Sequence, residues 1–494
     1  MAFQLFTRLE DLIKNSASNP ITATPSQVLA DIGSPSTSIA VLDNGEISSH
    51  CISTGSDNPD TLFQACSISK PVAGLAIMKL IELGHFSLDD KICDLLPDQI
   101  VQLMAIDSRT ERLLRTVTIK HLMSHTSGIS VGGFPGYPVY DRVPQLYQIF
   151  EGRSSANTQP IVMKTLPGLE FMYSGGGITV LQCVVENVMQ KPLAELVKEH
   201  VFDPLGMTRS CYYVGLDEQN VAKAHYHGYY PTEIKWHVQP ELAAAGLWTT
   251  PTDLMKVVRA VQESLEGNKP NTILRKESAE LMLTKIKGDF GLTWLADGIS
   301  FGHSGSNNPG YRCFTFGFAD LPWNNEPTAG QLKQEAQIAI PLMCGISVMT
   351  NAVTGDNVWL KIVSAVAYLK GWTAPSGHIA GDHFTMTPFP AFEESYASDE
   401  WMNWIGNSWS DGWMIAKDDK DNPVAGIDHE VLVKLRPAAI PPKQYADGKK
   451  SIDFVMDGIS ILVRLSWDGP DRTIETCNFG TQEVKVLRNT SNAT

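Results

Sequence analysis

The stretch FQACSISKPVAGLAIMKL, residues 63–80, combines a helix pattern with two polar residues that the helix does not explain. After Pro71, apolar residues recur three and four positions apart as far as Leu83, which predicts an amphipathic helix with one buried stripe. Pro71 fits the first helical turn, where its missing N–H removes no hydrogen bond. Ser67 and Lys70 then lie together at the helix entrance. A lysine there faces the positive end of the helix dipole, so its position needs another reason.

The composition is that of a globular, acidic chain. It has 494 residues, of which 43% are hydrophobic and 19% charged, and its formal net charge at pH 7 is −15. That length allows more than one domain, and that charge disfavours nucleic acid or an anionic membrane as a partner. No apolar run approaches the roughly 18 residues of a membrane span. Charges at Arg8, Glu10 and Asp11 disagree with a signal peptide, so we expect a cytoplasmic protein.

The order of patterns along the chain predicts an α+β fold. Two short β runs surround the Asp-Asn-Gly sequence at 43–45, which is typical of a hairpin. Helical segments fill the middle of the chain, strands return from Ile299, and a helix follows over about 358–372. Strands at both ends indicate one antiparallel sheet, assembled from both ends of residues 1–372 and flanked by helices.

The last quarter of the chain has a different pattern of apolar and polar residues. Residues 373–378 begin with TAPSG, and this composition predicts a linker. Beyond them, stretches such as SIDFVMDGISILVRLSW alternate apolar and polar residues and are broken by turn pairs. We expect residues 379–494 to form a small accessory domain, rich in antiparallel β structure.

Ser67 and Lys70 have the side chains that nucleophilic catalysis needs. The alternative is structural: Ser67 would cap the helix, and Lys70 would be a solvated surface charge. A serine hydroxyl becomes a good nucleophile when a neighbouring base takes its proton. A lysine serves as that base when burial or nearby cations lower its pKa from about 10.4, and the first turn of a helix supplies such a field. The helix start also offers the serine's own backbone N–H to an oxyanion.

Two further stretches add candidate groups. FMYSGGG places Tyr173 before glycines that admit a close approach of backbone and substrate, and its phenol is a candidate proton relay to the leaving group. FGHSGSNNPGY places His303, Ser304, Gly305 and Ser306 at a strand edge. We expect Gly305 to keep that edge open, and the Ser306 N–H to be the second oxyanion donor.

In this order, SISK at 67–70, YSG at 173–175 and HSG at 303–305 resemble the motifs of the serine β-lactamase and penicillin-binding-protein-like hydrolases. That superfamily includes class C β-lactamases, D-aminopeptidases, family VIII esterases and some acyltransferases. The segments TIKHLMSHTSGI, PLGMTRS, PELAAAGLWTTPTDL and SVMTN are also similar to its recurring segments. The resemblance spans about residues 8–372 and implies the β-lactamase/transpeptidase-like fold, with a mainly helical subdomain beside the sheet.

The resemblance also implies a role for each of these residues. Ser67 would attack the acyl carbon, Lys70 would accept its proton, and Tyr173 would share the acid–base work. The backbone N–H groups of Ser67 and Ser306 would bind the oxyanion, while His303 and Ser304 line the facing strand edge. The expected partner is a small-molecule substrate, and neither a metal nor a cofactor is implied. The oligomeric state stays open.

Two departures from the family pattern narrow the expected substrate. The tyrosine motif usually ends in asparagine, whose amide holds an acylamino side chain, and here the position is Gly175. The strand motif usually begins with lysine, and here it is His303, which is largely neutral at pH 7. Esters or small amides, such as metabolic or secondary-metabolite compounds, therefore fit better than β-lactams. An acyltransferase using the same serine is the alternative, and a non-catalytic ligand-binding protein of this fold is the rival class.

Other signals compete with this interpretation. GISVG at 128–132 spells the GxSxG nucleophile elbow, but a helix-like stretch precedes it where a strand is required. The five histidines of interest and the eight cysteines lack metal-ligand spacing, so no metal site is predicted. Most of the cysteines lie in apolar surroundings and are interpreted as buried, reduced thiols. Those histidines are at positions 121, 125, 225, 227 and 237. Trp248, Tyr137 and Trp236 are candidates for pocket walls or for plain packing.

Overall fold

The structure is a computed structural model, and it describes the chain over these residues: 2–17, 21–152, 155–227, 230–321, 341–372, 404–405, 409–410, 413–417, 423–427, 431–437, 443–444, 450–456, 461–468, 471–478 and 483–487. By their contacts, the described residues divide into two units. One comprises residues 34–355, and the other comprises residues 2–33, 356–372 and the segments from 404 on. The expected linker at 373–378 lies outside the described residues and stays a prediction.

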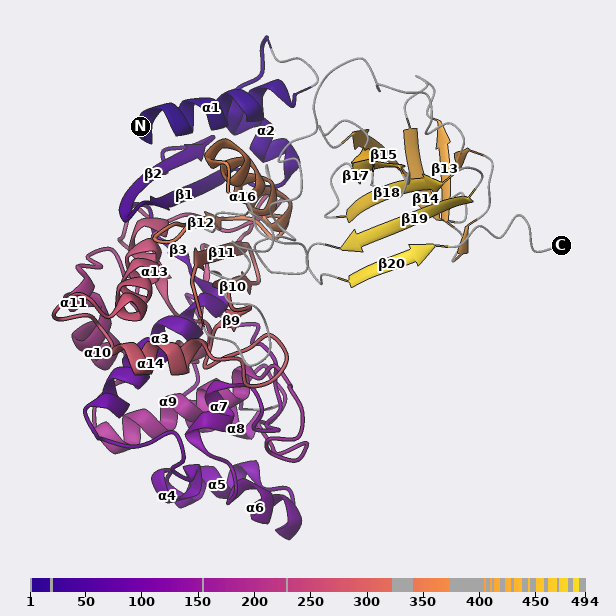
Figure 1. Cartoon of the computed structure of the whole chain (residues 1–494). Helices are drawn as coiled ribbons and strands as arrows, with labels where there is room; N and C mark the ends of the chain where they lie inside the picture. The colour runs from indigo at the N-terminus through magenta and orange to yellow at the C-terminus, as the bar shows by residue number, and fades with distance from the viewer. Residues whose placement is uncertain are drawn as a thin grey trace. The chain divides into compact units, whose positions relative to one another are not determined.

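The unit of residues 34–355 is built on one six-stranded antiparallel sheet, in the order β2-β1-β12-β11-β10-β9 (Figure 1). Its strands are β1 (Ser36–Asp43), β2 (Glu46–Ser53), β9 (Leu295–Ala296), β10 (Ser300–Asn307), β11 (Tyr311–Phe318) and β12 (Gly345–Thr350).

Strands from both ends of this unit meet in the sheet. β1 and β2 form the expected hairpin, and its turn residues Asn44 and Gly45 have φ angles of 52° and 84°, as a tight type I′ turn requires. β1 also pairs with β12, with Thr37 opposite Thr350. The prediction of one antiparallel sheet assembled from distant parts of the chain is confirmed.

Most helices of this unit belong to the chain between β2 and β9. Helix α13 (Pro251–Glu266) packs against β1, β2, β11 and β12. In Figure 1, helices α4 to α9 lie below the sheet and form the helical subdomain. The other helices and turns are η1 (Cys66–Ile68), α3 (Ser69–Glu82), α4 (Ile92–Leu95), α5 (Asp98–Met104), α6 (Ser108–Leu114), α7 (Ile119–Met123), α8 (Leu146–Glu151), α9 (Gly175–Met189), α10 (Leu193–Val197), η2 (Lys198–Phe202), α11 (Asp203–Leu205), α12 (Leu242–Ala245) and α14 (Lys276–Leu283).

Three pairs of short strands join loops of this unit. They are β3 (Phe63–Gln64) with β8 (Trp248–Thr249), β4 (Tyr137–Pro138) with β7 (His237–Val238), and β5 (His225–His227) with β6 (Tyr230–Pro231). The β3–β8 pair comes just before the turn η1, so it ties the start of the segment quoted above to the segment that follows α12.

Helix α3 differs from the expected amphipathic helix. Every residue from Ser69 to Met78 is buried, and Leu83, the last residue of the expected stripe, is 54% exposed. The reason is that α10, α12, α14 and η2 all pack around α3, so it has no solvent face over its first turns. Such a helix is buried all round and has no single apolar stripe.

The second unit contains three helices and an antiparallel sheet. Helices α1 (Ala2–Asn15), α2 (Pro25–Ile32) and α16 (Asp356–Lys370) pack against one another. The sheet has the order β13-β14-β15-β17-β18-β19-β20, with β16 paired to β17, and buries Trp404, Trp409 and Trp413 in its core. Its strands are β13 (Trp413–Lys417), β14 (Pro423–Ile427), β15 (Val431–Pro437), β16 (Lys443–Gln444), β17 (Lys450–Met456), β18 (Ile461–Asp468), β19 (Asp471–Asn478) and β20 (Glu483–Leu487).

The predicted antiparallel β structure near the C-terminus is therefore confirmed. Among the described helices, none has both the length and the apolar character needed to cross a membrane.

Candidate active site

Ser67 lies on the tight turn η1, directly before α3. Cys66 has a φ of 52°, a left-handed backbone conformation that costs energy in a residue other than glycine. The turn is held from outside: Ala65 N–H donates to the Leu247 carbonyl at 2.8 Å, and Leu247 N–H donates to Ser69 Oγ at 3.0 Å. Ser69 Oγ in turn donates to the Cys66 carbonyl at 2.5 Å. Ser67 is therefore presented on a fixed and strained turn.

Lys70 is directed at Ser67 from the first turn of α3. Its side chain is buried, and Nζ donates to Ser67 Oγ at 3.0 Å and to the Ala244 carbonyl of α12 at 2.7 Å. The same nitrogen lies 5.0 Å from the centroid of the Tyr173 ring. The structure thus brings together the three residues predicted to be catalytic. The lysine that helix electrostatics disfavours is held by a carbonyl and a hydroxyl.

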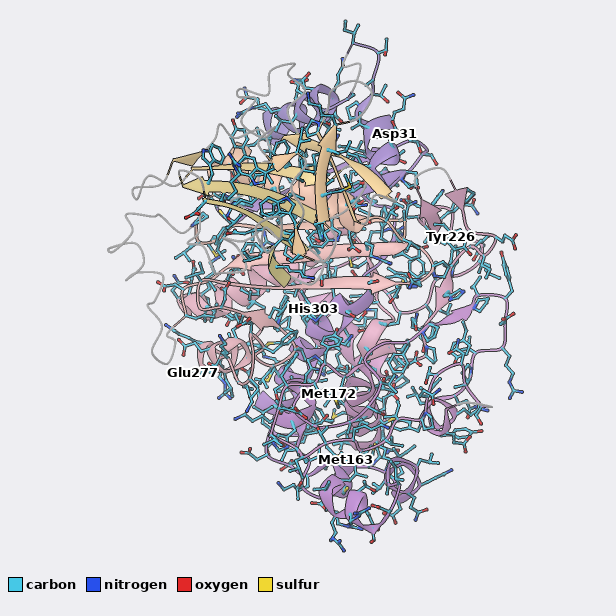
Figure 2. The ribbon with its side chains drawn as sticks, turned by 90° about the vertical axis from the view of Figure 1, so that its right-hand side faces the viewer. Asp31, Met163, Met172, Tyr226, Glu277 and His303 are labelled. Carbon is cyan, nitrogen blue, oxygen red and sulfur yellow. The ribbon has the colours of Figure 1, made fainter. Side chains whose placement is uncertain are left out.

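His303, labelled in Figure 2, lies on strand β10 of the six-stranded sheet, and its ring lies near Tyr173. Its ring centroid is 6.1 Å from that of Tyr173, and its Nδ1 lies 2.5 Å from the Ser304 carbonyl. Because a carbonyl only accepts, Nδ1 carries the proton, and Nε2 is a buried acceptor without a partner among the described residues. Burial, and then the charge of Lys70, lowers the pKa of His303 to about 3. His303 is therefore neutral at pH 7.

Gly305 lies where strand β10 approaches the turn η1 closely. Side chains on β10 alternate, so Ser304 and Ser306 are exposed while Gly305 is buried. A Cβ at Gly305 would lie 2.6 Å from the Ala65 carbonyl oxygen and 2.8 Å from Cys66 Cβ. Glycine is needed here for β10 to pack directly on the turn η1, and the expected open strand edge stays a prediction. Ser306, whose backbone N–H is the expected second oxyanion donor, comes directly after Gly305 on the strand.

Gly175 begins helix α9, directly after Ser174, whose Oγ caps the helix by accepting the Gly177 N–H at 2.7 Å. A Cβ at Gly175 would lie 2.9 Å from the Gly132 carbonyl oxygen and 3.0 Å from Phe134 Cε2. The loop that contains Phe134 thus packs against Gly175. A longer side chain at this position would therefore collide with that loop.

Two contributors to the site were not predicted from the sequence, although both lie in segments that resemble recurring segments of the family. The Ala244 carbonyl that accepts from Lys70 is a backbone group, which no motif can mark. His125, weighed above only among possible metal ligands, lies with its ring centroid 4.5 Å from that of Tyr173. Neither is close in sequence to the residue it contacts, so spacing alone does not reveal them.

The aromatic candidates for pocket walls belong to the core. Trp248 is buried, and its ring packs edge-on against those of Trp236 and Tyr311 at centroid distances of 5.5 and 5.6 Å. Tyr137 is also buried, and its hydroxyl accepts the Asn157 N–H at 3.1 Å. These contacts are those of packing residues, and a role in the pocket stays a prediction.

The competing GxSxG segment does not form a nucleophile elbow. Ser130 Oγ donates to the Pro160 carbonyl at 3.1 Å and accepts the Val162 N–H at 2.9 Å. Helix α7 and a loop precede it, whereas an elbow requires a strand there. This serine holds two loop segments together.

Comparisons with curated proteins give relatives of several kinds. Protein Rv1367c of Mycobacterium tuberculosis is 30% identical over 245 residues, which are 46% of this chain and 59% of that protein. Esterase EstB of Burkholderia gladioli is 32% identical over 177 residues, which are 34% of this chain and 43% of that protein. The chain therefore matches less than two thirds of the length of these relatives.

Solved structures resemble the whole chain or its larger part. The octameric penicillin-binding protein homologue from Pyrococcus abyssi aligns over 98% of this chain and 100% of its own, with a TM-score of 0.54 and 18% identity. A class C beta-lactamase aligns over 76% of this chain and 98% of its own, with a TM-score of 0.52 and 16% identity. These likenesses show the fold. Residues 22–353 match the family model described as Beta-lactamase, and the chain therefore belongs to the beta-lactamase family.

Proposed function

We propose that the protein is a serine hydrolase that forms an acyl-enzyme on Ser67 with an ester or a small amide. The main support is the 3.0 Å hydrogen bond between the buried Lys70 Nζ and Ser67 Oγ. A serine and a lysine in contact, at the start of a central helix, form the arrangement that nucleophilic catalysis needs. The name of one relative, Esterase EstB of Burkholderia gladioli, agrees with this class of substrate.

The proposed reaction has two halves. In the first, Ser67 Oγ bonds to the acyl carbon while Lys70 accepts the hydroxyl proton, and the backbone N–H groups of Ser67 and Ser306 stabilise the oxyanion. The bond to the alcohol or amine then breaks, and Tyr173 passes the proton held by Lys70 on to this leaving group. In the second half, water attacks the acyl carbon and gives up a proton to the same base, the bond to Ser67 Oγ breaks, and that proton returns to Ser67 as the acid leaves. Transfer to an acceptor other than water is the alternative.

Two observations favour esters and small amides over β-lactams. His303 is neutral, so the position where the family usually carries lysine offers no fixed cation to a carboxylate. The space beside Gly175 contains Phe134, so no amide side chain is available there for an acylamino group. An ester needs neither contact.

A covalent label tests the nucleophile. We expect a fluorophosphonate, or p-nitrophenyl acetate trapped at early times, to add one phosphonyl or acetyl mass to the peptide that contains Ser67. Ser67→Ala should lose the label and reduce kcat for p-nitrophenyl esters by several orders of magnitude, because no other group forms the covalent intermediate.

Ser130→Ala is the matched control, since that serine belongs to the competing motif. It should retain both the label and the ester hydrolysis. Labelling of the Ser130 peptide, or a Ser67→Ala variant that remains fully labelled, would contradict the proposed function.

A further inference from the structure

His125 contacts the backbone on both sides of Tyr173. The Met172 N–H donates to the His125 carbonyl at 2.8 Å, and the Ser174 N–H donates to His125 Nδ1 at 3.2 Å. One residue therefore anchors the residue before the tyrosine and the residue after it. Two hydrogen bonds of this kind fix both the position and the direction of the intervening segment.

The imidazole ring of His125 also packs against Tyr173 itself. The two ring centroids are 4.5 Å apart with an interplanar angle of 34°, and Phe290 meets the His125 ring edge-on at 5.3 Å. His125 has no exposed surface. A buried imidazole ring that is itself held by a neighbouring aromatic ring restricts the orientation of the Tyr173 phenol.

The protonation state of His125 follows from its contacts. Nδ1 accepts a backbone N–H, so the proton resides on Nε2, and protonation of Nδ1 would remove this hydrogen bond. Burial first, and then the charge of Lys70, lower the pKa of His125 well below its usual value. A neutral imidazole is thus the form that keeps the acceptor.

The backbone explains why histidine suits this position. His125 has a φ of 55°, in the left-handed region, where asparagine, aspartate and histidine are enriched among residues other than glycine. Glycine would allow this φ but supplies no acceptor. Asparagine would supply an acceptor at the same distance from the backbone but no ring. Aspartate would place a charge in a buried site.

We infer that His125 is a positioning residue for Tyr173, which holds the phenol in place for the proton transfer to the leaving group. The inference rests on the function proposed above, because it assigns Tyr173 to that step. A displacement of about 1 Å in a catalytic group costs on the order of a hundredfold in rate. The loss of the Nδ1 acceptor should therefore affect kcat far more than KM.

The test compares His125→Gly, which keeps the backbone conformation but loses the acceptor, with His125→Asn, which keeps both. For p-nitrophenyl acetate we expect His125→Gly to lower kcat about ten- to a hundredfold, with KM changed less than about threefold. His125→Asn should stay within about fivefold of the native kcat. The exposed His85→Asn is the matched control and should behave as the native protein.

The same change in the Tyr173→Phe background separates positioning from a general structural role. Tyr173→Phe should lower kcat strongly, and adding His125→Gly should then cost less than about threefold more, because both changes disable one proton path. Thermal melting and fluorophosphonate labelling of Ser67 show that each variant is folded. If the glycine variant melts too low for the assay, all variants are compared at a lower temperature, at which its melting curve shows that it is folded.

Three results would overturn the inference. Equal losses from His125→Gly in both backgrounds would show that His125 acts independently of Tyr173, and would leave the proposed nucleophile untouched. An asparagine variant as impaired as the glycine variant would show that restoring the acceptor does not restore the position of Tyr173, and would exclude the Nδ1 hydrogen bond as the positioning contact. A fully active Tyr173→Phe with normal labelling of Ser67 would remove both the proton role of Tyr173 and its positioning.

Discussion

His303 occupies the strand position at which this family usually carries lysine, and its charge state decides what the site offers an anionic substrate. Its ring is surrounded by Tyr173 and Phe290, at centroid distances of 6.1 and 6.0 Å, and Lys70 is the cation that acts on it. In these surroundings the imidazole is neutral, and its Nε2 is an acceptor. A neutral imidazole provides no cation for a substrate carboxylate.

The preference for esters over β-lactams should follow from the neutral state of His303. Because a charged contact and an amide hydrogen bond are both missing, we expect kcat/KM for nitrocefin to be about 30- to 1,000-fold below that for p-nitrophenyl butyrate. His303→Lys should raise the ratio of nitrocefin to ester turnover by about tenfold, while the neutral His303→Gln should not. Steady-state kinetics on both substrates measure the ratio. Equal turnover of the two substrates by the native protein would show that neither departure matters.

At the scale of elements, the contact between strand β10 and the turn η1 positions the two expected oxyanion donors. Ser67 is on the turn and Ser306 on the strand, so the distance between their backbone N–H groups depends on how closely the strand approaches. Gly305 permits this approach, since a Cβ would be 2.5 Å from Cys313 Sγ and 2.6 Å from the Ala65 carbonyl oxygen. Asn307 reinforces the contact by donating to Gln64 Oε1 at 2.6 Å.

A methyl group at this contact should therefore separate the two elements. We expect Gly305→Ala to lower the free energy of unfolding by about 1–3 kcal/mol through overpacking. It should also lower kcat for ester hydrolysis by more than about tenfold, because Ser306 moves away from Ser67. Gly55→Ala is the control, since its Cβ would meet only Ser53 Oγ at 3.8 Å. Denaturant unfolding and ester kinetics check both effects, and an unaltered Gly305→Ala would mean that the contact is not tight.

At the scale of the whole molecule, one buried acid makes folding depend on pH. Glu241 precedes α12 with no exposed surface, and its two carboxyl oxygens have no partner among the described residues. Burial raises the pKa of its side chain from 4.5 to about 8. The folded protein therefore keeps a proton that the unfolded chain loses above about pH 4.5. Because the folded state then binds more protons, its stability falls as pH rises from about 4.5 to about 8.

Glu241→Gln should remove this dependence. We expect the variant and the native protein to be similarly stable near pH 4.5, and the variant to gain about 1 kcal/mol per pH unit relative to the native protein up to about pH 8. Guanidinium unfolding at pH 5, 6, 7 and 8 measures the difference. Glu277→Gln, on the exposed surface of α14, should parallel the native curve. Parallel curves for Glu241→Gln as well would mean that Glu241 is not buried as a neutral acid.

The sequence by itself determined the features that depend on residues close together in the chain. The Asn-Gly pair forces the β1–β2 turn, alternating residues mark the strands, and SISK puts a lysine one helical turn from a serine, where the structure finds their hydrogen bond. The family resemblance was likewise visible in short motifs, and the matching family model confirms it.

Only the tertiary structure decided what depends on residues far apart in the chain. Helix α3 is buried on all sides because other helices surround it, and Gly305 is required because β10 crosses the turn at Ala65. The Ala244 carbonyl beside Lys70 and the His125 ring beside Tyr173 likewise join distant segments. Periodicity and spacing report a residue's own element, whereas these contacts arise when separate elements pack together, and so no local pattern encodes them.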